Sequence, residues 1–269
     1  MNRIIQPVII VSLLLMVYTT VMAQDEGKSS ADDLAKQLQN PVASLISVPF
    51  QNNFDFGIGS AAGTRYTMNF QPVIPMSIGE DWNLIARAIV PIVAQNNVFG
   101  ESGSQTGLGD VLISGFFSPK EPTAGGLIWG VGPAFLSPTA SNTLLGTEKF
   151  GLGPTAVALK QAGMTSFGAL INHLWSLAGD SDRSDINATF FQPFVAQNFP
   201  GGRALTLNTE MTRNWEVGST SGTINVVGSQ VFTIGNQASQ LALGPRIHYG
   251  DGNTASWGFR AAFVLLFPK

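Results

Sequence analysis

Residues 204–215 read ALTLNTEMTRNW, and apolar and polar side chains alternate along them. One face of an extended chain carries Leu205, Leu207, Thr209 and Met211, and the other carries Thr206, Asn208, Glu210 and Thr212. A period of two over about ten residues is typical of a β-strand with one apolar face, and a tilted strand of that length spans a bilayer. This stretch therefore predicts a transmembrane strand.

The same period recurs along the chain from residue 42 onward. In residues 65–75 the apolar face is Tyr66, Met68, Phe70, Pro72 and Ile74, and in residues 257–267 it is Trp257, Phe259, Ala261, Phe263, Leu265 and Phe267. We expect an all-β fold, an antiparallel transmembrane β-barrel of about twelve strands, because single-chain bacterial barrels have an even number. The expected strands are residues 43–56, 64–76, 82–94, 107–118, 126–138, 152–161, 164–176, 186–197, 204–215, 223–233, 239–249 and 257–267.

The connections between these strands alternate in length. The short ones are residues 79–81, 162–163, 200–202 and 235–237. The long polar ones are residues 57–63, 96–106, 140–150, 177–185, 216–222 and 250–256, and residues 119–125 are the exception, a little long for their side. Outer-membrane barrels have short periplasmic turns and longer extracellular loops, whereas a soluble sandwich has no reason to sort its loops in this way.

Aromatic residues gather at the ends of the expected strands, where rings with a polar edge settle at membrane interfaces. On the long-loop side these are Tyr66, Trp175, Trp215, Tyr249 and Trp257, and near the short turns they are Trp82, Trp129 and Phe267. We interpret the two groups as aromatic girdles.

The first 23 residues have the pattern of a secretory signal peptide. Arg3 precedes an almost unbroken apolar run, residues 7–21, and Val21-Met22-Ala23 offers small residues for cleavage. The alternative is an uncleaved membrane anchor, for which the run is short. Residues 24–41 then predict a periplasmic segment with a short helix from Ser30 to Leu38, and residues 42–269 the barrel. We expect this segment to be a tail rather than a plug, because it is too short to fill a lumen.

Composition excludes several classes of protein. The chain has no cysteine, so it is not a disulfide scaffold. Its net charge is −3 and it has no basic cluster, so nucleic acid is not an expected partner. After residue 23, no apolar stretch approaches the ~18 residues that a spanning helix needs.

The polar face of the strands predicts the residues that line the lumen. They are Asn69, Gln71, Arg87, Asp110, Lys160, Asn208, Glu210, Arg246, His248 and Arg260. Charges face inward because an Arg or Lys that faces lipid at the midplane costs ~2–4 kcal/mol. Two interpretations remain open: a self-neutralising lumen that is closed by Arg–Glu pairs, and a polar channel with a mild cationic excess.

Motifs for catalysis, cofactors or metals are weak. Gly151 to Ala156 fit a loose dinucleotide pattern but lack the preceding parallel strand, and the acidic residues 180–185 lack essential positions of a calcium loop. Ser176 lies near His173 in sequence, but their odd spacing along a strand places them on opposite faces. We therefore expect no enzyme, no cofactor and no metal site.

Several short segments resemble one family of bacterial outer-membrane proteins. They are residues 34–41 (LAKQLQNP), 63–66 (GTRY), 80–84 (EDWNL), 107–110 (GLGD), 117–120 (FSPK), 153–155 (GPT) and 266–269 (LFPK). The chain is similar along its mature length to the meta-pathway phenol-degradation family, some members of which carry the label neuromedin U. The resemblance implies an outer-membrane barrel and uptake of hydrophobic or aromatic compounds. It carries over Asp110 without a role.

We therefore expect a monomer in the bacterial outer membrane that acts as a channel or facilitator for passive uptake of small molecules. Its expected partners are membrane lipid, lipopolysaccharide and a small solute. The alternatives are a non-transporting barrel whose outer loops bind lipopolysaccharide or a surface partner, an outer-membrane enzyme, and a soluble secreted β protein.

Overall fold

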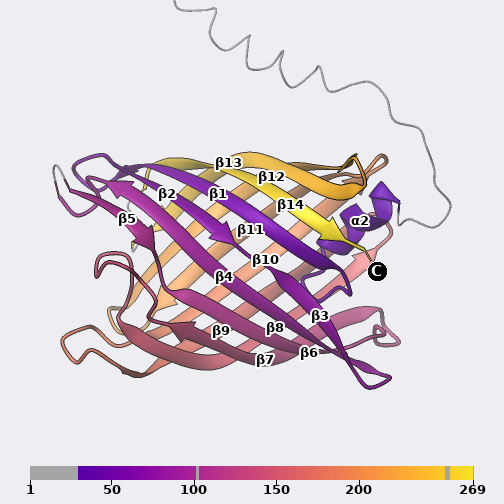
Figure 1. The fold of residues 1–269 in the computed structure, drawn as a ribbon, viewed down its shortest axis with the longest axis horizontal. Coiled ribbons are helices and arrows are strands. Elements are labelled where there is room, and N and C mark those ends of the chain that lie inside the picture. The colour runs from indigo at the N-terminus through magenta and orange to yellow at the C-terminus, as the bar shows by residue number, and fades with distance from the viewer. Residues whose placement is uncertain (1–29, 101–102, 252–254, 269) are drawn as a thin grey trace, which may run out of the picture.

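The computed structural model describes residues 30–100, 103–251 and 255–268, and the predicted signal peptide lies outside these residues. A single antiparallel sheet curls around until its first and last strands meet (Figure 1). Its strands are β1 (Ile46–Ile58), β2 (Gly63–Phe70), β3 (Val73–Ile78), β4 (Trp82–Asn96), β5 (Ser104–Leu108), β6 (Val111–Pro119), β7 (Leu127–Ser137), β8 (Lys149–Ala162), β9 (Thr165–Gly179), β10 (Asn187–Phe199), β11 (Arg203–Asn214), β12 (Ser219–Ile234), β13 (Gln237–Gly250) and β14 (Trp257–Phe267).

The fourteen strand segments form a barrel of twelve strands. Segments β2 and β3 are two parts of one strand, since both pair with β1 and β4, and Gln71-Pro72 separates them. Segments β5 and β6 both pair with β4 and are separated by Gly109-Asp110. Proline has no N–H to donate to a ladder, so Pro72 marks a natural interruption. The predicted closed antiparallel barrel of about twelve strands is confirmed.

Each strand shows one face to the lumen and the other to the outside. In β9, Ser166 and Leu170 are buried, whereas Phe167 and Ile171 are 47% and 43% exposed. The same alternation is clear in β8, β12, β13 and β14, and large apolar side chains dominate the exposed face. A soluble protein would bury such a continuous apolar surface, whereas a barrel in a bilayer turns it toward lipid.

All eight predicted girdle residues lie on the outward face. Trp175, Trp215 and Trp257 are about half exposed near the long loops, and Trp82 and Phe267 are exposed near the short turns. Trp82 and Trp129 pack edge to face with ring centroids 5.8 Å apart. The remaining rings, Tyr66 and Tyr249, hydrogen-bond through their hydroxyls to Asn52 and Thr209 on neighbouring strands. The ring positions agree with two girdles.

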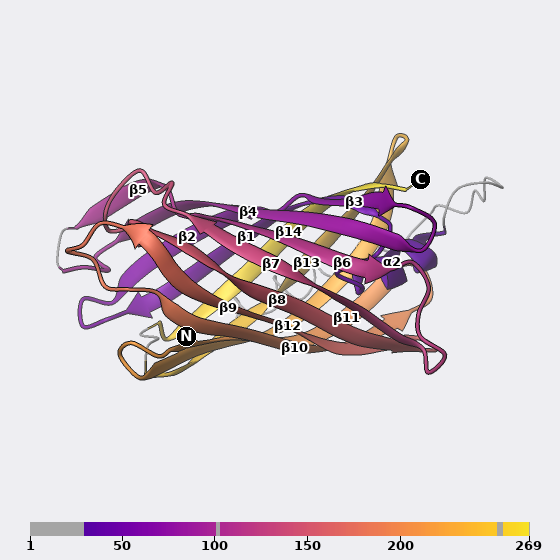
Figure 2. The same cartoon turned by 90° about the horizontal axis from the view of Figure 1, so that it is seen from below.

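A short helix, α2 (Ala31–Leu38), precedes the barrel and confirms the helix predicted there. Ser30 caps it, because its Oγ accepts a hydrogen bond from Asp33 N at 3.1 Å, and Asp32 and Asp33 lie in the first turn, where the helix dipole favours negative charge. Among the described residues, no helix is long and apolar enough to cross a membrane. Both views place α2 at the end of the barrel where the chain finishes (Figures 1 and 2).

Strands approach one another closely where glycine replaces a side chain on the inner face. A Cβ on Gly244 of β13 would overlap the carbonyl oxygen of Val226 and lie 2.9 Å from Val227 Cα. These atoms belong to the backbone of the paired strand β12, so they cannot move away without breaking hydrogen bonds between the two strands. Gly228 of β12 faces outward, and a Cβ there would meet its nearest atom, Leu243 O, only at 4.0 Å.

We expect Gly244→Ala to destabilise the barrel by about 1–3 kcal/mol, the range for overpacking, and to lower the yield of refolding into detergent. Gly228→Ala is the matched control and should refold like the wild type. The measurement is the fraction of protein that migrates as the compact, heat-modifiable form on an unheated gel. Equal yields for the two variants would contradict the steric argument.

Candidate functional site in the barrel lumen

Most of the predicted lumen residues face inward. Four line an interior cavity, namely Gln71, Arg87, Asn208 and Arg260. Four more lie on the same inner face by strand alternation, namely Asn69, Glu210, Arg246 and His248. The lumen is therefore polar along one part of its wall. The other two of the ten predicted residues, Lys160 and Asp110, do not line this part.

Lys160 points outward, contrary to the prediction. In β8 the buried positions are Thr155, Val157 and Leu159, so Lys160 belongs to the opposite face, and it is exposed beside Phe167 of β9. The position is two residues from the end of the strand at a short turn. A lysine there extends its ammonium group along the surface to the water boundary, which avoids the cost of a charge at the midplane.

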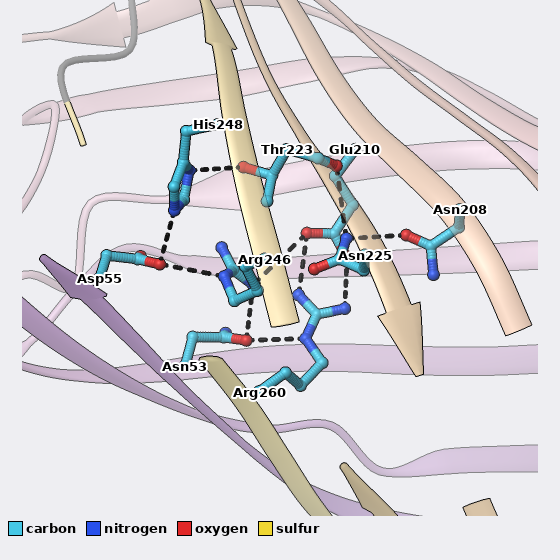
Figure 3. A network of polar contacts seen from close by, with 9 residues as sticks. All are labelled: Asn53, Asp55, Asn208, Glu210, Thr223, Asn225, Arg246, His248 and Arg260. Carbon is cyan, nitrogen blue, oxygen red and sulfur yellow. Dashed lines mark hydrogen bonds and ion pairs between the residues drawn. The ribbon is translucent and has the colours of Figure 1, made fainter. Parts of the chain in front are cut away.

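Two arginines and a carboxylate form the centre of a network on the inner wall (Figure 3). Arg260 donates to both carboxylate oxygens of Glu210, at 2.8 and 2.9 Å. Arg246 Nε lies 3.0 Å from Asp55 Oδ1, and Asn53 Oδ1 accepts from both Arg246 and Arg260, at 2.6 and 2.8 Å. Bidentate arginine–carboxylate pairs are strong and fix geometry, so this network ties β1, β11, β13 and β14 together from inside.

His248 and two asparagines extend the network. His248 Nε2 lies 3.0 Å from Asp55 Oδ1, and its Nδ1 lies 3.0 Å from Thr223 Oγ1. Asn225 Nδ2 donates to Asn208 Oδ1 at 2.8 Å. All nine residues of Figure 3 come from five neighbouring strands, β11, β12, β13, β14 and β1, so the network lies along one wall.

The sequence prediction missed the partners that β1 contributes, Asn53 and Asp55. Alternation around Phe50, Phe54 and Phe56 could have placed them inside. Asn52 disguised the pattern, because it is a polar residue on the outward face. There it accepts a hydrogen bond from the Tyr66 hydroxyl at 2.6 Å and donates to the carbonyl of Ala261 at 3.1 Å.

The arrangement of the histidines bears on the enzyme alternative. His173 and His248 each contact a threonine, with Nδ1 2.7 Å from Thr189 Oγ1 and 3.0 Å from Thr223 Oγ1. Ser176 instead donates to Asp185 at 3.0 Å. The Thr223–His248–Asp55 chain has the order of a catalytic triad, but Thr223 is buried in the wall and Asp55 is held by Arg246. The expectation of no enzyme stays a prediction.

The inner wall opposite the network carries an apolar cluster, set among buried polar side chains such as Ser114 and Asn172. Ile85, Phe116, Val157, Leu159 and Leu170 form a buried cluster with inward-facing side chains from β4, β6, β8 and β9. Phe190 and Phe194 of β10 pack against this cluster. The lumen thus has a charged network on one side and an apolar cluster on the other.

The N-terminal segment enters the lumen at the short-turn end. Leu34 and Ala35 of α2 pack against the inward side chains of Val231, Val264 and Leu266, and Val42 joins the apolar cluster on the other wall. Residues 37–41, together with Ala43 and Leu45, line the interior cavity. The segment is a plug, and the expectation of a tail outside the lumen is wrong.

The physical reason is that the plug need not fill the whole lumen. Eight helical residues carry one apolar stripe, and the next seven cross from one wall to the other. Polar contacts add to the apolar ones: Gln161 Nε2 donates to Lys36 O at 2.9 Å, Thr206 Oγ1 to Gln39 Oε1 at 3.3 Å, and Asn83 Nδ2 to Ser44 Oγ at 3.1 Å. A short segment therefore reaches both walls of the mouth, while a cavity of about 290 Å³ remains above it.

Asp110 holds a loop over the inner face at the opposite end. Its carboxylate accepts hydrogen bonds from Ala140 N at 3.2 Å and from the backbone N and hydroxyl of Thr147 at 2.6 and 2.7 Å. Gly107 faces the lumen, since it pairs with buried Val93, and a Cβ on it would overlap the Ser141 hydroxyl. Residues 138–148, the loop between β7 and β8, therefore fold inward and narrow the mouth. Within the GLGD segment, Gly107 leaves room for the loop and Asp110 anchors it.

The acidic segment 180–185 braces the same loop from outside. Arg183 donates to the carbonyls of Thr143 and Gly146 at 3.0 and 2.7 Å and pairs with Glu148 at 3.2 Å. Asp185 pairs with Lys149 at 3.0 Å. The hydrogen bonds from Lys149 and Ser176 lower the pKa of Asp185 below its ordinary value of 3.8. This loop has a structural role in fixing the long-loop end.

Comparison with known proteins identifies the fold. The chain is similar to the crystal structure of an outer membrane channel from Pseudomonas putida F1, with a TM-score of 0.65 and 14% identity over 83% of this chain and 94% of that chain. It also matches an outer membrane phospholipase from Salmonella typhi, with a TM-score of 0.49 and 10% identity over 89% of this chain and 99% of that one. No model of a protein family and no curated protein matches the sequence. The fold is that of outer-membrane barrels, and the phenol-degradation label stays a prediction.

We expect Asp110→Ala to release residues 138–148 from the inner face, because three hydrogen bonds lose their acceptor. A spin label on Leu144→Cys, the single cysteine in the chain, should change from a restricted to a mobile spectrum. Asp182→Ala is the matched control from the neighbouring loop and should leave the spectrum unchanged. A restricted label in the Asp110→Ala variant would show that the other contacts of the loop, those of Arg183, Thr139 and Ser141, fix it without Asp110.

Proposed function

We propose that the protein is an outer-membrane channel or facilitator for passive uptake of small molecules, and that the plug closes its passage in the state described here. The proposal rests on one observation: a plug lies inside the barrel, but it takes no part in the strand pairing that closes the sheet. Ladder pairing between β1 and β14 begins at Ile46, beyond the plug. Residues 31–45 can therefore move without breaking the strand ladder.

The contacts of the plug support a reversible closure. Its apolar burial rests mainly on Leu34, Val42 and Leu45, and each such side chain contributes roughly 1.5–3 kcal/mol. The polar contacts involve neutral amides and hydroxyls, apart from the carboxylate of Asp32, which accepts from Gly202 N. Because the plug makes few contacts relative to the barrel wall, a local opening costs less than unfolding.

The inner surface supports passage of solutes with a polar group. Arginines and amides line one wall and aliphatic and phenyl side chains line the other. Uptake of hydrophobic or aromatic compounds, which the family resemblance implies, is part of this proposal, and Phe190 and Phe194 offer such compounds a surface. The likeness to an outer membrane channel supports a transport role for a barrel of this shape.

The test uses the absence of cysteine from the natural sequence. In the double variant Gln39→Cys/Thr206→Cys, a short thiol-reactive cross-linker should fix the plug to β11, because the side chains of Gln39 and Thr206 lie 3.3 Å apart. We expect measurable single-channel conductance and liposome flux from the unlinked protein and a large loss of both on linking. The single variants, treated with the same reagent, are the controls. Folded, unlinked protein that gives neither conductance nor flux would refute the channel.

One observation favours the alternative, a barrel that binds lipopolysaccharide. Arg213 faces outward near the long loops, with its guanidinium 5.3 Å from the centre of the Trp215 ring and its Nη1 3.0 Å from Thr220 Oγ1. An arginine held above an interfacial tryptophan is placed to contact lipid phosphates.

We expect Arg213→Ala to weaken the binding of purified lipopolysaccharide to the refolded protein severalfold. Arg203→Ala is the control, because Arg203 is an exposed arginine at the start of β11, near the short turns. The measurement is co-migration or calorimetric titration with lipopolysaccharide. Equal effects of the two variants would point to general attraction between charges.

A further inference from the structure

Arg87 is an arginine of the inner wall with one described side-chain hydrogen bond. Its Nη2 donates to Gln71 Oε1 at 2.9 Å. A guanidinium carries five N–H donors, and Gln71 contributes no charge to balance it. Within the described part of the chain, Glu210 attracts Arg87 at longer range, but the carboxylates of the lumen network form their ion pairs with Arg246 and Arg260. The side chain is partly exposed and lines the cavity, so its remaining donors have room for a ligand.

The surrounding charges leave a cationic surplus. Between the outer loop and the plug, the described strands turn four arginines inward, at positions 65, 87, 246 and 260, and two carboxylates, Asp55 and Glu210. Four positive and two negative charges leave an excess of two. A charge taken out of water is costly unless it is paired, so a cation beside a cavity favours an anionic guest.

The cavity that Arg87 borders is not uniformly polar. Val73, Leu170, Phe194 and Val264 supply apolar walls around it, and Gln71 and Gln192 supply amides. Its volume is about 290 Å³, and the plug forms its floor. A small inorganic anion would satisfy Arg87 but leave the apolar walls against water. A molecule with a carboxylate at one end and a short apolar body satisfies both.

We infer that this cavity binds a small organic monoanion, with its carboxylate on the guanidinium of Arg87 and its apolar body against Leu170 and Phe194. The inference rests on the proposed function, because the channel supplies the route to the cavity, and it names the class of solute. The carboxylate forms a fork-to-fork pair with the free edge of the guanidinium, as arginine does with planar anions. Displacement of water from the apolar walls adds to the affinity.

The experiment is calorimetric titration of the refolded full barrel, in non-ionic detergent, with hexanoate. Its neutral counterpart, hexanol, and inorganic phosphate are titrated in parallel, and empty micelles give the background. We expect hexanoate to bind at least tenfold more tightly than either comparison ligand. Arg87→Gln should lower the hexanoate affinity by about tenfold or more, the range for loss of a charge-assisted hydrogen-bond pair.

Arg65→Gln is the matched control. It removes the same charge from the same wall, but Arg65 donates to Gln95 at 2.8 Å and is not part of the cavity lining. We expect it to retain most of the affinity. If both variants lost the same hexanoate affinity, the binding would come from the general positive potential of the lumen and not from a defined site. If hexanoate and hexanol bound equally to the wild type, the pocket would recognise only the apolar body of the ligand. Either outcome would overturn the inference.

Failure of this inference can be separated from failure of the channel. Binding is measured at equilibrium without a membrane, whereas the cross-linking experiment measures flux. Conductance without preferential hexanoate binding refutes the anion site alone. Hexanoate binding without any conductance refutes the channel and leaves the binding site. The comparison of ligands on the wild type needs no variant to fold, so the site stays testable if Arg87→Gln does not refold.

Discussion

The pairing of β1 with β14 is the interaction on which the rest of the structure depends. Eleven residue pairs, from Ile46–Phe267 to Phe56–Trp257, join the two ends of the sheet. In lipid, an open edge would leave backbone N–H and C=O groups without partners, at a cost of several kcal/mol each. Closure removes that edge and fixes the register. Because strands alternate strictly, one register decides which side chains face lipid and which face the lumen.

Closure also explains the character of the lumen. Charges that cannot face lipid cheaply gather inside, where Arg246 and Arg260 find Asp55, Glu210 and Asn53. These residues come from neighbouring strands, so the network braces one wall, and an apolar cluster lies on the opposite wall. The plug bridges the two walls, since the apolar residues of α2 contact Val231, Val264 and Leu266 at the short-turn ends of β12 and β14, and Val42 joins the apolar cluster. What remains is a cavity bordered by Arg260, whose donors are bound by Glu210 and Asn53, and by Arg87, whose one described side-chain hydrogen bond is to Gln71.

The two ends of the barrel are occupied by segments that are held by different physical means. At the short-turn end, a segment with its own helix lies inside the mouth and is held by apolar burial and neutral hydrogen bonds. At the long-loop end, residues 138–148 connect two strands of the wall, β7 and β8, and are fixed by Asp110 and Arg183 through charge-assisted hydrogen bonds. The first arrangement is suited to opening, because it is separate from the sheet. The second is suited to shaping the mouth, because charged anchors hold it on both sides.

Much of the fold could be predicted from the sequence, because alternating apolar and polar residues show which face of a strand points outward. Twelve strands, eight outward rings and most of the inward polar residues follow from alternation and loop lengths alone. The prediction failed where a polar side chain lies on the outward face: Lys160 is exposed there near the end of β8, and Asn52 hydrogen-bonds there to Tyr66 and Ala261. The sequence by itself determined the closed barrel and its two surfaces, since these depend on local periodicity. Only the tertiary structure decided that residues 31–45 plug the lumen, that Asp110 anchors a loop and that Arg87 faces a cavity, because each depends on contacts between segments far apart in the chain.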